Sequence, residues 1–302
     1  MSKCAKIWLI IVSSLVVLGC GFFAGVMTML DWDFTKLSTV KYETNEHQIE
    51  KDYKSISVIT DTADIVFVPS TNMETSVVCR EQNNMKHSVT VQDDTLVIEV
   101  ADTRKWYEHI GIFFSSPKIT VYIPSGEYAL LSVKGDTGDV EIPNAFNFDS
   151  IDISVSTGDI KNYACASDNI KIKTTTGDIT VSDITCEGDV NIQVSTGDAR
   201  LDDISCKSVI SSGSTGDISL KNVISTEKYS IERSTGDVQL DRCDAAEIYI
   251  KTDTGDVRGT LLSEKIFIVA TDTGRVNVPK TITGGRCEIT TNTGDIRIKT
   301  EK

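Results

Sequence analysis

The stretch STGDI, residues 156–160, is one of nine close copies of a T-G-D motif in this chain, one of which carries Arg275 in place of the aspartate. The glycines of the nine copies are Gly138, Gly158, Gly177, Gly197, Gly216, Gly236, Gly255, Gly274 and Gly294. Successive glycines are 19 or 20 residues apart, and so regular a period indicates a solenoid, in which each repeat is one turn of a coil. A catalytic loop needs one copy, so nine copies predict a corner that the backbone turns nine times.

Apolar residues flank each corner at fixed distances. Counted from the threonine of T-G-D, they stand six and four residues before it and three after it, as at Ile151, Ile153 and Ile160. The spacing of two within a block is the side-chain period of a β-strand. From −4 to +3 the separation is odd, so the inward face changes across the corner, and glycine gives the freedom for that bend. Position −4 loses its apolar residue at Ser211.

Each repeat is therefore predicted as strand, T-G-D corner, strand and a shorter return, and no repeat can bury its apolar face alone. Stacked rungs pair in parallel about 4.8 Å apart, so nine rungs span roughly 43 Å. We expect an all-β fold, a parallel β-solenoid of nine to ten rungs whose T-G-D part covers residues 131–302. The nine glycines are its predicted structural corners.

Residues 51–130 are predicted to form an N-terminal β cap. The segment ISVITDTADIVF, residues 56–67, fits the repeat with Ala63 in place of glycine and indicates a degenerate first rung. Four strand patterns follow it, TSVVC, HSVTV, TLVIEV and KITVYIP, and we expect them to cover the open end of the solenoid. Residues 31–50 are expected to form a polar stalk. Basic residues are expected to protect the last edge strand at the far end: Arg297, Lys299 and Lys302.

Residues 7–30 carry no charge, and a helix of about 36 Å over this run is long enough to cross a bilayer. Lysines precede the run and aspartates follow it: Lys3, Lys6, Asp31 and Asp33. The positive-inside rule then predicts a single-pass protein of the cell membrane, with residues 1–6 in the cytoplasm and the β region outside. The alternative is a lipoprotein processed at VLGC, residues 17–20, although mostly apolar residues follow Cys20.

The net charge and the absence of known catalytic motifs argue against two classes of function, nucleic-acid binding and enzymatic catalysis. The net charge of −14 argues against binding to nucleic acid, which needs clustered lysine and arginine, and favours cationic partners. No G-x-S-x-G, H-E-x-x-H or Walker motif occurs. His47, His87 and His109 lie in polar segments, where we expect solvated side chains. We therefore predict no catalytic residue, no cofactor and no enzymatic activity.

The corner aspartates are expected to stack into a ladder of like charges about 5 Å apart. Calcium would relieve their repulsion, and the candidate ligands are Asp159, Asp178, Asp198, Asp217 and Asp237. The motif differs, however, from the G-G-x-G-x-D nonapeptide of calcium-binding β-rolls. The favoured alternative is solvated aspartates that pair with basic residues two positions further on: Lys161, Arg200, Arg258 and Arg297.

An aromatic group in the loop 101–118 is the candidate contact patch for a partner, and its members are Trp106, Tyr107, Phe113 and Phe114. The alternative is that these side chains pack inside the cap. Separately, Cys186 and Cys206 occupy the same position in adjacent rungs. We expect them to be stacked, buried and reduced, with a disulfide as the alternative.

The chain resembles a bacterial putative-adhesin family of domains of unknown function, found on anchored envelope proteins and near Lia-type envelope-stress systems. The resemblance rests on ISVITDTADIVFVPS (56–70), DDTLVIEV (93–100), KITVYIPSG (118–126) and the repeats from GDTGDVEI (135–142) onward. It implies a right-handed solenoid in an extracytoplasmic, membrane-associated setting and supplies no catalytic residues. Two roles remain open: a surface interaction module that contacts an envelope protein, glycan or wall polymer, and a structural or regulatory component of an envelope-stress complex.

Overall fold

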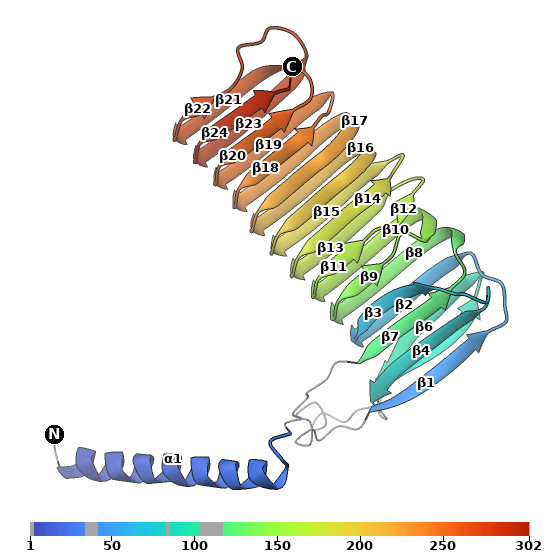
Figure 1. Cartoon of the computed structure of the whole chain (residues 1–302), viewed down its shortest axis with the longest axis vertical. Coiled ribbons are helices and arrows are strands. Elements are labelled where there is room, and N and C mark those ends of the chain that lie inside the picture. Colours follow the sequence, from blue (N-terminus) through green and yellow to red (C-terminus); the bar gives the residue numbers. More distant parts are fainter. Residues whose placement is uncertain (1–2, 34–41, 83–84, 103–116, 302) are drawn as a thin grey trace.

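The computed structural model describes residues 3–33, 42–82, 85–102 and 117–301 (Figure 1). One helix, α1 (Lys3–Met29), precedes a stack of strands that pair into one continuous solenoid. The N-terminal strands are β1 (Tyr42–Ile49), β2 (Ser55–Thr62), β3 (Asp64–Pro69), β4 (Thr75–Gln82), β5 (Met85–Gln92), β6 (Thr95–Asp102) and β7 (Lys118–Ile123). The T-G-D rungs contain β8 (Gly126–Thr137), β9 (Val140–Ile142), β10 (Phe146–Thr157), β11 (Ile160–Asn162), β12 (Cys165–Ala166), β13 (Ile170–Thr176), β14 (Ile179–Thr185), β15 (Asp189–Thr196), β16 (Ala199–Thr215), β17 (Ile218–Thr235), β18 (Val238–Cys243), β19 (Glu247–Thr254), β20 (Val257–Leu261), β21 (Lys265–Thr273), β22 (Val276–Asn277), β23 (Gly285–Thr293) and β24 (Ile296–Thr300).

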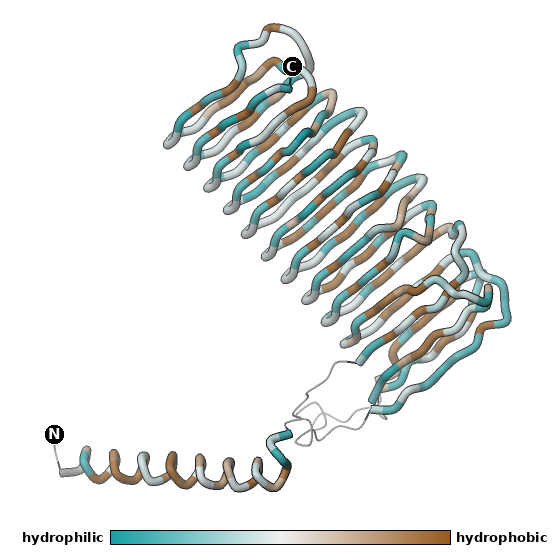
Figure 2. The backbone as a smooth tube through the Cα atoms, in the orientation of Figure 1, coloured by the Kyte–Doolittle hydropathy of each residue, from teal (hydrophilic) through white to brown (hydrophobic). Residues whose placement is uncertain are grey.

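The parallel β-solenoid predicted from the repeat is confirmed by the strand register. Equivalent residues of successive rungs lie side by side, as Ile151, Ile170 and Val190 do. Their side chains are buried and form columns along the interior. Figure 2 shows the underlying pattern, in which apolar and polar positions alternate along each turn. Stacking therefore buries the apolar face that a single turn would expose.

The corners combine an unusual backbone conformation with a close approach between rungs. Eight of the nine T-G-D glycines have positive φ, between 122° and 156°, and Gly274 is the exception. A Cβ atom at Gly158 would lie only 2.1 Å from the carbonyl oxygen of Gly138 in the neighbouring rung. Glycine is therefore required both for its φ angle and for its lack of a side chain.

A second corner follows six residues after four of these glycines. Its residues have φ angles of 51° to 57° and are Asp183, Asp203, Asn222 and Arg242. Asn and Asp tolerate this left-handed conformation better than most residues, because their side chains can bond to the local backbone. The T-G-D pattern does not predict this corner, although aspartate and asparagine recur at that position.

The N-terminal rungs stack in an order that differs from the sequence. β2 and β3 lie against β8 and β9, the first T-G-D rung, with Thr62 beside Thr137. β6 and β7 lie on the other side of β2 and β3 and also run parallel to them. β5 and β4 then pair antiparallel with β6 and β7. The parallel stack thus ends in antiparallel strands.

The stalk expected over residues 31–50 must be corrected for its second half. Residues 42–49 form β1, which pairs antiparallel with β4 along its whole length. The physical reason is that β4 would otherwise present a row of unpaired backbone N–H and C=O groups at the edge of the sheet.

The C-terminal rungs also stack out of sequence order, which corrects the expected position of the last edge. β23 pairs with β19 on one side and with β21 on the other, so the last rung in sequence lies inside the stack. The edge is formed by β21 and β22, and on β21 Ile266 and Ile268 are 42% and 49% exposed. Arg297 and Lys299 belong to β24, which pairs with β20, so they do not protect the last edge as predicted. Lys302 lies outside the described residues.

The helix α1 contains a candidate membrane span, Ala5–Met29, with a mean hydropathy of 2.5. Its length and composition would allow it to cross a bilayer. Figure 2 shows this helix in brown and pale tones along most of its length, which marks a largely apolar segment.

Candidate functional site

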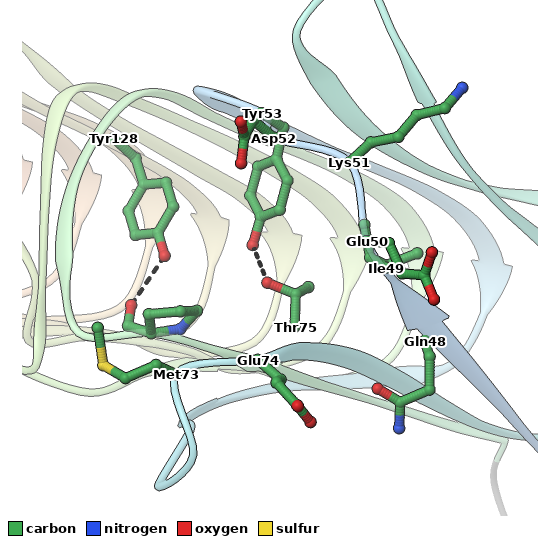
Figure 3. Close-up of a pocket in the computed structure, with 11 residues that line it drawn as sticks. Gln48, Ile49, Glu50, Lys51, Asp52, Tyr53, Met73, Glu74, Thr75 and Tyr128 are labelled. Carbon is green, nitrogen blue, oxygen red and sulfur yellow. Dashed lines mark hydrogen bonds between the residues drawn. The ribbon is translucent and has the colours of Figure 1, made fainter.

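The N-terminal cap contains a pocket of about 560 Å³ where the segment after β1 passes the start of β4 (Figure 3). This volume lies within the usual range for ligand sites, about 300–1,000 Å³. Three parts of the chain line it: residues 48–53, residues 73–75, and the Pro124 and Tyr128 pair near the start of β8. The pocket therefore depends on the antiparallel cap, since β1 and β4 bring the first two segments together.

Two tyrosines form the aromatic part of this pocket. The rings of Tyr53 and Tyr128 are stacked, with centroids 6.0 Å apart and an angle of 13° between the planes. Tyr128 also packs against Phe148 at 5.7 Å and, edge to face, against Phe146 at 6.5 Å. Both phenylalanines are buried, so they anchor the tyrosine pair to the solenoid core.

The hydroxyl groups of both tyrosines already have partners. Tyr53 Oη lies 2.7 Å from Thr75 Oγ1, and Tyr128 donates a hydrogen bond of 2.8 Å to the carbonyl oxygen of Pro124 (Figure 3). Burial raises the pKa of both phenols, so they remain neutral at physiological pH. The two rings are thus held in place before any ligand arrives, which lowers the entropic cost of binding.

The rim of the pocket is polar and mainly acidic. Glu50, Asp52 and Glu74 carry three carboxylates against the single amine of Lys51, and all four residues are exposed. An aromatic platform with acidic groups around it suits sugar rings or a cationic group, by stacking and by cation–π attraction. It disfavours phosphate-rich or acidic ligands.

The predicted corner aspartates form a ladder, but their carboxylates have a structural role that the sequence analysis missed. Each Oδ1 accepts a hydrogen bond from the backbone N–H of the corner residue in the next rung, for example Asp198 from Asp217 at 2.8 Å. The same bond, 2.7 to 2.8 Å long, is made by Asp139, Asp159, Asp178, Asp217, Asp237, Asp256 and Asp295. The negative charges are therefore partly balanced by backbone dipoles.

Basic residues add a second form of balance near the C-terminal end of the ladder. Arg258 Nη2 lies 2.7 Å from Asp237 and 3.2 Å from Asp256, and Arg297 pairs with Asp295. In the described part of the chain, the corner aspartates do not form a group of three with oxygens within 4.8 Å of one another. Calcium binding by the five candidate aspartates thus remains a prediction. In each of them Oδ1 already accepts a backbone hydrogen bond, and this bond would compete with a calcium ion for that oxygen.

The predictions for the aromatic contact patch, the cysteine pair and the histidines have different outcomes. Trp106, Tyr107, Phe113 and Phe114, the predicted contact patch, lie outside the described residues. Cys186 and Cys206 are buried free thiols on neighbouring rungs, since Thr185 pairs with Ser205. The expectation of a solvated side chain is wrong for His87, which is 4% exposed.

The comparison with known protein families identifies the chain. The family model Toastrack DUF4097 matches residues 53–257 and, in a second overlapping match, 207–302. The chain belongs to the Toastrack DUF4097 family. This membership confirms the resemblance drawn from the T-G-D repeats to a family of domains of unknown function. No match to a curated protein was found.

Two solved structures are similar to this Toastrack chain, and the first of them, with the higher TM-score, shares its fold. A putative adhesin from Parabacteroides merdae ATCC 43184 is 12% identical, with 86% of this chain and 96% of that chain covered and a TM-score of 0.52. A putative adhesin from Bacteroides fragilis NCTC 9343 is 17% identical, with 86% and 97% covered and a TM-score of 0.48. At these identities the likeness concerns the fold alone.

The tyrosine pocket itself was not found by sequence reasoning. Tyr53 and Tyr128 are 75 residues apart in the sequence and lie in segments without a recognisable motif. The only local signal was a tyrosine next to charged residues, in EKDYK and in SGEY. Their stacking depends on the out-of-order packing of β2 and β8, which the repeat pattern does not predict.

Proposed function

We propose that this Toastrack protein is a membrane-anchored, extracytoplasmic, non-catalytic interaction module with an adhesin-like role. The observation that supports the proposal most strongly is the pocket with the stacked Tyr53 and Tyr128 rings and the acidic rim. Anchoring is supported by the apolar helix α1 and by the charges on either side of it. The structural neighbours that are described as putative adhesins agree with this role.

The proposed ligand is a neutral or cationic group of the cell envelope, such as a glycan, a wall polymer or an amine-bearing protein segment. Stacking on a fixed aromatic ring suits these groups, and the acidic rim adds attraction for a positive charge. The pocket also lies near the membrane along the chain. Tyr42 follows Met29 by 13 positions, so β1 begins no more than about 47 Å from the end of α1. A ligand within the envelope fits this reach better than a distant surface.

A binding assay with a matched pair of variants tests the proposal. The full chain, reconstituted in lipid nanodiscs, would be mixed with washed envelope fragments of its own host cell, and the bound fraction measured after sedimentation. Tyr53→Leu keeps an apolar side chain but loses the stacking ring, and we expect roughly tenfold weaker binding, about 1.4 kcal/mol. Tyr249→Leu is the control, because Tyr249 is a partly exposed tyrosine on a solenoid rung remote in sequence from the pocket.

Two results would contradict the proposal. Equal binding by wild type and Tyr53→Leu would remove the pocket as the contact site. Cross-linking in intact membranes could also recover only neighbouring membrane proteins, with unchanged yield in Tyr53→Leu. That result would instead favour a structural or regulatory component of an envelope complex.

A further inference from the structure

A cluster of three side chains with metal-binding atoms is buried inside the cap, on strands β4 and β5. Cys79 and Glu81 alternate on β4 and face inward, and His87 lies on β5, which follows β4 in sequence. They are 0%, 1% and 4% exposed, respectively. The Cys79 sulfur, a Glu81 carboxylate oxygen and a His87 ring nitrogen all lie within 4.8 Å of one another. Among the described residues this is the one group of three or more such side chains.

The polar contacts around the cluster orient two of its three members. Glu81 Oε2 lies 2.7 Å from His87 Nδ1 and also accepts a 2.6 Å hydrogen bond from the His87 backbone N–H. Glu81 Oε1 accepts a 2.7 Å hydrogen bond from Asn45 Nδ2 on β1. His87 Nε2 lies 3.1 Å from Thr60 Oγ1 on β2. Four strands therefore contribute to one small polar site.

Burial of this cluster lowers the stability of the fold unless a bound ligand offsets the loss of hydration. Burial of a carboxylate and an imidazole in an apolar interior is unfavourable even when the two are paired. Besides Cys79, β4 buries Thr75, Val77 and Gln82, so Glu81 is the one acidic side chain that this strand buries. The mechanism proposed for the tyrosine pocket does not use any of these side chains.

We propose that Cys79 Sγ, the Glu81 carboxylate and His87 Nδ1 form a binding site for one Zn²⁺ ion. A set of sulfur, nitrogen and oxygen ligands is typical of zinc, and three protein ligands leave the fourth tetrahedral position for a water molecule. Tetrahedral ligands at bond lengths of about 2.0–2.3 Å lie about 3.3–3.8 Å apart, so the side chains need only small movements.

The surrounding contacts match those that support metal ligands in proteins. A histidine that binds zinc through one ring nitrogen usually donates the other N–H to an oxygen, and Thr60 Oγ1 is placed to accept from Nε2. A ligating carboxylate is usually hydrogen-bonded through its second oxygen, and Asn45 provides that bond to Glu81.

Zinc binding would release one proton from the site, because the Cys79 thiol becomes a thiolate. The proton that His87 Nδ1 shares with Glu81 would move to Nε2 of the neutral ring, where it can be donated to Thr60 Oγ1. Burial, with a smaller effect of the Glu81 charge, raises the pKa of Cys79 to about 12. The affinity for zinc should therefore rise steeply with pH in the neutral range, because the metal competes with this proton.

The experiment uses the full chain in detergent, stripped with a chelator and then dialysed against buffered Zn²⁺. We expect about one zinc ion per chain by elemental analysis and a higher midpoint of thermal unfolding. Substitution with Co²⁺ should give tetrahedral d–d bands and a thiolate-to-cobalt charge-transfer band. Cys79→Ala and His87→Gln should lower bound zinc at least tenfold at limiting metal, and the charge-transfer band should disappear in Cys79→Ala.

The control is Cys243→Ala, which removes an equally buried thiol outside the cluster. This variant should keep both the zinc and the charge-transfer band. Equal zinc content in Cys79→Ala and Cys243→Ala would assign the metal to other thiols and overturn the proposal. Absence of bound zinc and of any shift in the wild-type midpoint would also overturn it, and would leave Glu81 and His87 as a hydrogen-bonded pair only. Neither result depends on the tyrosine pocket.

Discussion

At the scale of single residues, the T-G-D corner is a contact between rungs as much as a turn within one. The glycine allows the carbonyl oxygen of the preceding rung to approach, and the aspartate that follows accepts a backbone N–H from the next rung. Both interactions need a neighbouring rung at the correct distance. The motif therefore recurs once per turn because each copy completes the hydrogen bonding of another copy.

Gly216→Ala should destabilise the protein strongly. At this position φ is 122°, and a Cβ atom would lie 2.1 Å from the carbonyl oxygen of Gly197. We expect a loss of at least about 1–3 kcal/mol in unfolding free energy, seen as a lower midpoint in thermal unfolding of the full chain. Gly135→Ala is the matched control, because its Cβ would only meet Thr60 Cγ2 at 3.6 Å. Equal midpoints for the two variants would show that the corner tolerates a side chain.

Ser211 was recognised in the sequence as a lost apolar position, and the structure gives the reason. The side chain of Arg233 from the next rung is buried there, and its Nη2 donates a 3.1 Å hydrogen bond to Ser211 Oγ. Gly213 leaves room for the Arg233 guanidinium group, because a Cβ atom at position 213 would lie 1.7 Å from Arg233 Nη1. Burial lowers the pKa of Arg233 to about 10, and Nε has no hydrogen-bond partner among the residues that the structure describes.

Replacement of this buried arginine should separate the effects of charge and volume. Arg233→Met keeps much of the length and removes the buried charge, so the variant should be as stable as wild type or more stable, by up to about 1–4 kcal/mol. Arg233→Ala leaves a cavity and should be less stable than Arg233→Met by about 2–5 kcal/mol. Chemical denaturation of the three proteins measures both differences. A methionine variant that is clearly less stable than wild type would mean that the guanidinium itself stabilises the rung.

These residues mark the limit of prediction from the sequence. The corners and the core columns were predictable, because glycine, aspartate and the apolar positions repeat with one period and each has a local cause. The bonds of Asp198 and the site of Arg233 depend on the adjacent rung, and the burial of His87 depends on the cap. The Tyr53–Tyr128 pocket also joins distant segments. Such contacts follow from the three-dimensional order of the rungs, which the local pattern does not contain.

At the scale of the elements, both ends of the solenoid place a terminal rung inside the stack. The β2–β3 rung lies between β6–β7 and β8–β9, and the β23–β24 rung lies between β19–β20 and β21–β22. A rung at the end of a chain would normally fray, since it has a neighbour on one side only. Insertion gives it hydrogen bonds on both sides. The first and last parallel rungs in sequence are thereby held on both sides by rungs that follow or precede them in the chain.

Hydrogen exchange should reveal this arrangement. We expect the amides of β23 (Gly285–Thr293) to exchange more slowly than those of β21 (Lys265–Thr273), although β23 is closer to the C-terminus. The reason is that β23 pairs with two strands, whereas in the described part of the chain β21 pairs with β23 alone and has exposed apolar side chains. Mass spectrometry of peptic fragments over time provides the measurement, with β16 in mid-solenoid as the slow reference. Faster exchange in β23 than in β21 would contradict the inserted order.

At the scale of the whole molecule, an apolar helix precedes an acidic solenoid, and the cap is the part of the solenoid that is nearest to this helix in the chain. The candidate pocket and the buried Cys79–Glu81–His87 cluster both belong to this cap. The T-G-D rungs extend away from it in the chain (Figure 1). Such an arrangement places the chemically varied residues near the apolar helix in the chain and the repetitive ones farther from it. The function proposed here therefore depends on which side of the membrane the cap occupies.

The orientation of the anchor can be tested with a thiol reagent that does not cross membranes. Lys3 and Lys6 precede α1 and Asp31 and Asp33 follow it, so the β region should lie outside the cytoplasm. A Lys280→Cys variant adds an exposed thiol to the loop between β22 and β23 and should be labelled in intact cells. Cys4 lies at the N-terminal end of α1 in the sequence, so it should be labelled only after the cells are permeabilised. Site-resolved mass spectrometry distinguishes labelling at Cys4 from labelling at position 280. The buried Cys243 should remain unlabelled in both conditions and so report that the fold is intact. Labelling of Cys4 but not of position 280 in intact cells would reverse the predicted orientation and remove the basis for an extracytoplasmic ligand.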